Sequence, residues 1–166
     1  MIGNAVPVRM AEILAVSIKE AIEKATVERM QQRGDIKPDD RVLVGFYKGY
    51  QHWKIITHQG FYYVRADGRE GAMSIEELHP LPRLLLLHSN ERMQLYELTD
   101  IEPRYYGKDY IQRLGFKPSG EMYIGVGFDL SSKYKLKDIG IDKKKIVFKE
   151  RFAPYITTFE KLISKK

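Results

Sequence analysis

The chain has 166 residues, of which 43% are hydrophobic, with a formal net charge of +6 and no Cys. The lack of Cys excludes disulfides, thiolate metal sites and Cys nucleophiles, and no apolar run approaches the ~20 residues that a membrane-spanning helix needs. The first residues lack the pattern of a secretory signal, so we expect a cytoplasmic protein without a membrane partner.

Residues 1–34 combine a short turn with a long helix. In the turn, Asn4 is a capping residue and Pro7 suits the first helical turn, where its missing N–H has no partner to lose. Apolar residues then recur at the spacing of one helical face, at Met10, Ile13, Leu14, Ile18, Ala21, Ile22 and Ala25. Gly34 is a stop signal. The pattern predicts one helix from about Val8 to about Arg33.

The amino-acid sequence of this turn resembles a motif of a known family. Ile2-Gly3-Asn4-Ala5-Val6-Pro7 followed by an Ala/Ile-rich helix resembles the last motif of the DNA (cytosine-5) methyltransferases. The resemblance implies that this stretch closes the S-adenosylmethionine pocket, with Asn4 and Ala5 at the amino-acid end of the cofactor. It also implies that the apolar front of the helix packs on the nucleotide-binding sheet of the catalytic domain. An ordinary capped helix is the simpler alternative.

The same resemblance limits what this chain does alone. The family's nucleophile is a Cys after a Pro, and neither that residue nor a Gly-rich cofactor loop precedes the motif here. We therefore expect the C-terminal region of a methyltransferase, with no catalytic or metal-ligating residue and no cofactor bound by this fragment. The apolar front at Met10, Ile13, Leu14 and Ile18 would lie against the rest of the catalytic domain in the full enzyme. Without that cover, we expect it to pack on the appended domain or on a second copy in a homodimer.

Residues 35–166 form the second predicted domain. Residues 1–35 contain five Lys or Arg and five Asp or Glu, so the whole +6 charge belongs to the remainder. After the turn-like segment 35–40, the spacing of apolar residues changes from that of a helix to that of strands. Residues 41–47, 53–57 and 61–66 are short β-branched and aromatic runs, which predict a three-stranded meander.

The rest of this domain mixes short strands and helices. Ser74 with Glu77 predicts a capped short helix, and the further expected helices are 108–114 and 154–164 with a turn at 135–139. The further expected strands are 83–88, 93–99, 121–130 and 145–149, with an extended piece at 102–106. This order predicts an α+β fold, in which a long N-terminal helix precedes a small curved mixed sheet or partial barrel. Its size and element order are similar to the PUA-like group, which includes the EVE and YTH domains.

A basic and aromatic cluster is the candidate DNA site. It comprises Lys48, Trp53, Lys54, Arg65 and Arg69, with Tyr50, His52, Tyr62 and Tyr63 nearby in the sequence. Aromatic rings interleaved with cations can stack a flipped base and bind phosphate. Arg65 and Arg69 flank a glycine turn, which should leave both guanidinium groups available to phosphate. Alternatively, the aromatics belong to the core and Asp67 neutralises one Arg.

The composition leaves three functions open. The first is a DNA-binding or target-recognition domain appended to a methyltransferase. The second is a nuclease domain fused to a methyltransferase in a restriction-modification system, although the carboxylates Glu97, Asp100, Glu121 and Asp129 show no recognisable metal spacing. The third is an interaction or dimerisation module whose basic charge is incidental.

Overall fold

The computed structural model describes the chain except for residues 1–6, 34, 140, 147, 150–151 and 164–166. Its contacts divide the chain into two units, Met1–Asp35 and Ile36–Lys166. We call the first the N-terminal unit and the second the compact unit. Asn4 and Ala5, the predicted cofactor-binding residues, lie outside the described residues.

One helix, α1 (Val8–Arg33), makes up the described part of the N-terminal unit. Its bounds confirm the prediction. The carbonyl of Pro7 accepts hydrogen bonds from the backbone N–H groups of Met10 and Ala11, at 2.8 and 3.1 Å, so the helix begins just after the proline. The apolar front residues are exposed, with fractions between 52% for Leu14 and 60% for Ile13. Among the described residues, no helix has the length and apolar character to cross a bilayer.

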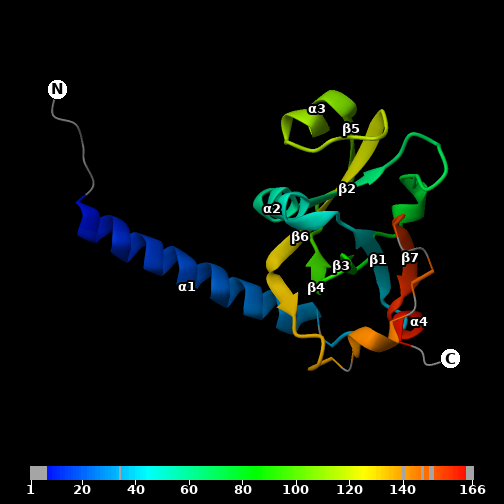
Figure 1. Cartoon of the computed structure of the whole chain (residues 1–166). Coiled ribbons are helices and arrows are strands. Elements are labelled where there is room, and N and C mark those ends of the chain that lie inside the picture. Colours follow the sequence, from blue (N-terminus) through cyan, green and yellow to red (C-terminus); the bar gives the residue numbers. More distant parts are fainter. Residues whose placement is uncertain (1–6, 34, 140, 147, 150–151, 164–166) are drawn as a thin grey trace. The chain divides into compact units, whose positions relative to one another are not determined.

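The compact unit is built on one mixed sheet (Figure 1). Within the described residues its strands are β1 (Arg41–Phe46), β2 (Phe61–Arg65), β3 (Leu84–His88), β4 (Met93–Leu98), β5 (Arg104–Gly107), β6 (Met122–Tyr134) and β7 (Tyr155–Thr158). The order along the sheet is β2-β6-β4-β3-β1-β7, and β5 also pairs with β6. Parallel pairing joins β1 to β3, and the other pairs are antiparallel.

Short helices connect these strands. The α-helices are α2 (Gly49–Gln59), α3 (Lys108–Arg113) and α4 (Phe159–Ile163), and the 3-10 turns are η1 (Glu76–Leu78) and η2 (Lys143–Lys145). In Figure 1, α3 and β5 lie at one end of the compact unit and α4 lies at the other. The predicted cap of η1 is confirmed, because Ser74 N–H donates to Glu77 Oε2 at 2.7 Å and Glu77 N–H donates to Ser74 Oγ at 3.3 Å.

The long strand β6 lets the sheet curl into a half-barrel. It pairs with β2 along one edge, and along the other with β5 near its start and with β4 beyond it. Two glycines in β6 admit close neighbours: a Cβ at Gly125 would lie 2.6 Å from the Tyr106 ring, and one at Gly127 would lie 2.5 Å from Thr99 Oγ1. The curvature also brings Tyr62 of β2 to β1, where its hydroxyl donates to the carbonyl of Phe46 at 3.1 Å.

Two apolar clusters form the core, one on each face of the central strands. Leu43, Leu85 and Leu87 belong to one cluster, and Val44, Leu84 and Leu86 belong to the other. Because successive side chains of a strand point to opposite faces, β3 is buried along its whole length. The fold is α+β with a curved mixed sheet, as expected. The similarity to the PUA-like group stays a prediction.

Three sequence expectations are wrong. Residues 53–57 belong to the helix α2, so the predicted meander does not exist. The β-branched run at 55–57 favoured a strand. However, Ile56 is fully buried, Trp53 one turn earlier packs against the same core, and Gly60 ends the helix with a left-handed φ of 67°.

The other two errors concern the C-terminal part. Residues 145–149 form no strand in their described positions. The last strand is β7, and this strand replaces the first part of the helix expected at 154–164. The open edge of β1 explains this outcome, since β7 pairs with it from Arg41↔Thr158 to Val44↔Tyr155.

Candidate nucleic-acid interface

The parallel pair of β1 and β3 brings two connections together at one edge of the sheet. Phe46 at the end of β1 pairs with His88 at the end of β3. The pairing continues for one more residue, because Tyr47 N–H donates to the carbonyl of His88 at 3.0 Å. The chain that leaves β1 for α2 and the turn from β3 to β4 therefore meet at the carboxyl ends of these strands, where clefts are common in mixed sheets.

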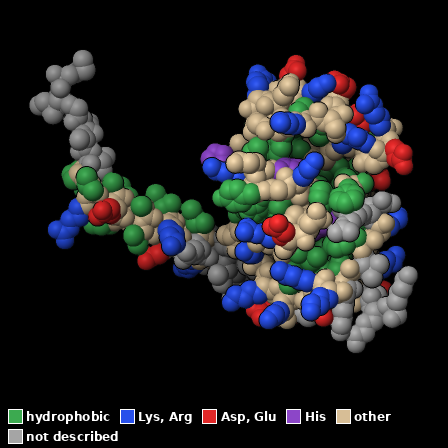
Figure 2. Space-filling model, in the orientation of Figure 1, with side chains coloured by type: hydrophobic (Ala, Val, Ile, Leu, Met, Phe, Trp, Pro, Cys, Tyr) green, Lys and Arg blue, Asp and Glu red, His purple; other side chains and the backbone are tan. Residues whose placement is uncertain are grey.

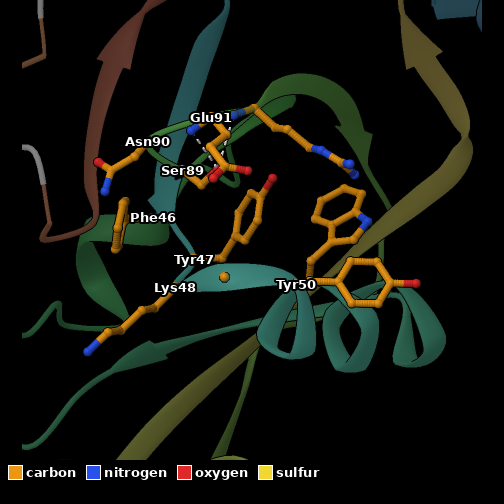
Figure 3. Close-up of a pocket in the computed structure, with 10 residues that line it drawn as sticks. Phe46, Tyr47, Lys48, Tyr50, Ser89, Asn90 and Glu91 are labelled. Atoms are coloured by element: carbon orange, nitrogen blue, oxygen red, sulfur yellow. Dashed lines mark hydrogen bonds between the residues drawn. The ribbon is translucent and has the colours of Figure 1, made fainter.

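A pocket with a volume of about 350 Å³ lies at this edge, between residues 46–53 and residues 89–92. We call it the Trp53 pocket. Figure 3 shows Tyr47 pointing toward the turn of Ser89 and Glu91, with Lys48 extending away from that turn. The volume exceeds that of a single side chain and suits a small planar ligand.

Aromatic rings form one side of the Trp53 pocket. The rings of Tyr47 and Trp53 are 5.0 Å apart at 37°, and Trp53 is 6.3 Å from Tyr96 behind it. Burial, together with the neighbouring Tyr47, raises the pKa of Tyr96 to about 12, so Tyr96 stays a neutral phenol near pH 7. This packing fixes the Trp53 ring on the first turns of α2.

A hydrogen-bonded turn forms the opposite side. Ser89 N–H donates to the carbonyl of Arg92 at 2.8 Å. The Ser89 hydroxyl oxygen accepts from the N–H groups of Glu91 and Arg92, at 3.3 and 3.1 Å. Because these bonds hold the turn from within, the side chains of Asn90 and Arg92 project from a fixed backbone.

Polar groups complete the pocket. The Tyr47 side chain is 3% exposed, and its hydroxyl has no hydrogen-bond partner within the described part of the chain. This hydroxyl oxygen has almost no accessible surface, so the Tyr47 ring supports the pocket wall from within the core. Lys48 and Arg92 are exposed at the pocket and supply positive charge.

Two of the predicted DNA-binding residues, Lys48 and Trp53, line this pocket, and Tyr50 joins them. Lys54 lies next to Trp53 on α2, where it is exposed and does not line the pocket. Figure 2 shows further Lys and Arg side chains spread over the visible face of the compact unit.

The predicted pair Arg65 and Arg69 differs from expectation. Asp67 lies between them, with its carboxylate 3.4 Å from Arg65 Nε and 4.0 Å from Arg69 Nε. The Arg65 guanidinium also donates to the carbonyl of Glu70 and is 26% exposed, so this group is occupied by the fold. Arg69 is 66% exposed. Neither Arg lines the Trp53 pocket. The expectation of two available guanidinium groups is wrong because Asp67 takes part in the turn.

Sequence reasoning missed the turn residues Ser89, Asn90, Glu91 and Arg92, as well as Phe46 and Tyr47. Residues 89–92 were predicted only as the connection between the expected strands 83–88 and 93–99. Its sequence, Ser-Asn-Glu-Arg, is polar and typical of turns, and only the parallel pairing of β1 with β3 brings it to Trp53. Nothing local in the sequence signals that pairing.

The carboxylates considered for a nuclease serve other purposes. The described residues contain no cluster of three or more His, Asp or Glu side chains suited to hold a metal ion. Glu97 is buried, bonds to Arg83 at 3.3 Å and accepts from the Tyr134 hydroxyl, while Glu121 pairs with Lys108 at 2.8 Å.

Comparison with protein-family models, with curated proteins and with solved structures finds no match to this chain. Function must therefore be argued from the motif and from the Trp53 pocket.

Proposed function

We propose that this chain is the C-terminal region of a DNA (cytosine-5) methyltransferase. In this proposal α1 completes the catalytic domain and the compact unit is an appended DNA-binding domain. The motif of residues 2–7 supports the first part, together with the helix that begins at Val8 directly after it. Asn4 and Ala5 would face S-adenosylmethionine in the full-length enzyme.

The exposed front of α1 also supports this part of the proposal. Met10, Ile13, Leu14 and Ile18 are each more than half exposed. Burying such side chains is worth roughly 1.5–3 kcal/mol each, so a covering surface would be strongly stabilising. The nucleotide-binding sheet of the catalytic domain is the cover that the family resemblance implies. A homodimer through α1, or packing on the appended domain, would also cover it.

The DNA-binding part rests on the Trp53 pocket. An aromatic wall and two cations, which outnumber the one carboxylate of Glu91, form a combination suited to one unpaired nucleotide. The base would stack on the Trp53 side of the pocket, with the buried Tyr47 ring behind Trp53. Lys48 and Arg92 would bind the flanking phosphates, which makes this part of the affinity sensitive to salt.

The residues present indicate which steps this chain would perform and which belong to the rest of the enzyme. The chain contains no Cys, so the nucleophile for methyl transfer would belong to another part of the enzyme. The compact unit would hold the DNA and would add affinity or selectivity to a reaction performed elsewhere. We expect no methyl transfer and no measurable S-adenosylmethionine affinity from this chain alone.

Fluorescence anisotropy with end-labelled duplexes tests this proposal. A duplex with one unpaired thymidine should bind more tightly than the fully paired duplex. Affinity should fall with salt, and the double substitution Lys48→Ala/Arg92→Ala should flatten the salt dependence by about one to two units of slope. Lys37→Ala, an exposed charge in the segment before β1, is the matched control.

The outcomes separate the candidate functions. Equal affinity for paired and unpaired DNA, or a salt slope that the double substitution leaves unchanged, would remove the Trp53 pocket as the site. No DNA binding at 50 mM salt would favour the interaction module instead. Divalent-metal-dependent cleavage of the DNA would favour the nuclease.

A further inference from the structure

A second pocket lies beside the Trp53 pocket, with a volume of about 380 Å³. We call it the His52 pocket. It is bounded by the first turns of α2, by Tyr63 of β2 and by residues 115–119 after α3. Lys48 lines both pockets, so the two are neighbours across the start of α2.

The walls of the His52 pocket are also aromatic. The Phe116 ring lies 5.0 Å from the His52 ring at 79° and 5.8 Å from the Tyr63 ring at 69°. Burial, with the neighbouring Tyr110 and Tyr106, raises the pKa of Tyr63, so this side is uncharged near neutral pH. Lys117 and Ser119 are exposed where they line the pocket.

His52 has a defined hydrogen-bonding state in this wall. Its Nδ1 accepts from the backbone N–H of Lys48 at 3.1 Å. Burial lowers the pKa of His52 to about 4, so the ring is neutral near pH 7. A neutral ring whose Nδ1 accepts carries its proton on Nε2, which makes that nitrogen a donor.

We propose that the two pockets bind two adjacent unpaired nucleotides of one DNA strand. One base occupies the Trp53 pocket, the next occupies the His52 pocket, and the Lys48 ammonium contacts the phosphate between them. This inference rests on the proposed function and names its substrate class, which is a locally unpaired stretch of at least two nucleotides. The shared Lys48 carries it, because one basic residue that lines two neighbouring aromatic pockets matches the alternation of base and phosphate along a strand.

The test compares duplexes with no, one and two adjacent unpaired thymidines by anisotropy at one salt concentration. The second base should stack in the His52 pocket, so the duplex with two unpaired thymidines should bind at least about five-fold tighter than the duplex with one. Ser119→Trp places a bulky ring at an exposed position of the His52 pocket. This substitution should remove the five-fold gain and leave the affinity for one unpaired thymidine unchanged.

Gln59→Trp, at an exposed position in the last turn of α2 outside both pockets, is the matched control and should keep the gain. Equal affinity of the parent chain for one and two unpaired thymidines would overturn the two-nucleotide site and leave the proposed function standing. A gain that survives Ser119→Trp in a folded protein would also overturn it. If the parent chain binds paired and unpaired DNA equally, this result would instead contradict the proposed function. The comparison of duplexes with the parent chain decides the question even if the Ser119 variant does not fold.

Discussion

The helix α1 and the strand β3 are both rich in aliphatic side chains, and they differ in what covers them. In β3 the side chains from Leu84 to Leu87 are 0% exposed, because the sheet buries both faces of the strand. In α1 the residues Ile13 and Leu14 are 60% and 52% exposed. Local sequence specifies both elements, but the side chains of β3 are buried by neighbouring strands, whereas Ile13 and Leu14 of α1 stay largely exposed. The contrast shows that β3 depends on its neighbours in the sheet, whereas the helical pattern of α1 carries apolar side chains that are more than half exposed.

The largest expected difference between the two regions is in stability. Leu86→Ala removes a fully buried side chain of β3 and should lower the free energy of unfolding by about 2–5 kcal/mol. Ile13→Ala in α1 should change the free energy of unfolding by less than about 0.5 kcal/mol, because most of this side chain is already exposed to water in the folded chain. Urea denaturation followed by circular dichroism measures both. Similar losses for the two variants would mean that α1 is covered.

A buried charge network gives the next largest effect in the compact unit. Arg83 bonds to Asp40 at 2.7 Å and to the buried Glu97 at 3.3 Å. Arg83→Met would leave the Glu97 carboxylate without its cation, which should cost roughly 2–4 kcal/mol. Arg113→Met, at an exposed position of α3, is the control and should have little effect in the same denaturation experiment. A cost below 1 kcal/mol for Arg83→Met would contradict this role.

The buried His52 makes the stability of the compact unit depend on pH. Its pKa falls from 6.5 in the unfolded chain to about 4 in the folded one, because burial disfavours the charged ring. The unfolded state therefore binds more protons between these values, and stability is lost as the pH falls from about 6.5 to about 4. His52→Gln should reduce this loss relative to the parent in urea midpoints between pH 7 and pH 4.5. If the urea midpoints of the two proteins fall in parallel with pH, the lowered pKa of His52 is contradicted.

Amide hydrogen exchange should separate the regions without any substitution. The amides of β3 pair within a central strand and should be protected close to the global stability. Those of α1 lie in a helix whose residues Ile13 and Leu14 are more than half exposed, and should exchange at least about 100-fold faster. Mass spectrometry of peptides from the intact chain resolves both. Protection of α1 that rises with protein concentration would indicate a homodimer through this helix.

The parts of the fold that sequence predicted well depend on neighbours in the chain. The bounds of α1 follow from Pro7 and the helical spacing, and the cap of η1 follows from Ser74 and Glu77. The hairpin of β3 and β4 was also predictable, because a polar turn joins two apolar runs.

The errors occur where distant residues decide the outcome. The β-branched run of α2 became helical because Ile56 and Trp53 share a core face, and β7 formed because the edge of β1 was open. In the candidate site, Lys48 and Trp53 were predicted from the interleaving of basic and aromatic residues, and both line the Trp53 pocket. The turn at Ser89–Arg92 was not found, since only the pairing of β1 with β3 brings it to the pocket.

The most direct test of the account uses the intrinsic fluorescence of Trp53, which is the single Trp of the chain and lies in the proposed site. Titration with a duplex that contains one unpaired thymidine should quench this fluorescence in a saturable way, and Trp53→Phe should weaken binding by up to about ten-fold while the protein stays folded. The fully paired duplex should quench it far less. Unchanged fluorescence at concentrations where anisotropy shows the DNA to be bound would contradict the account, because the DNA would then occupy another surface.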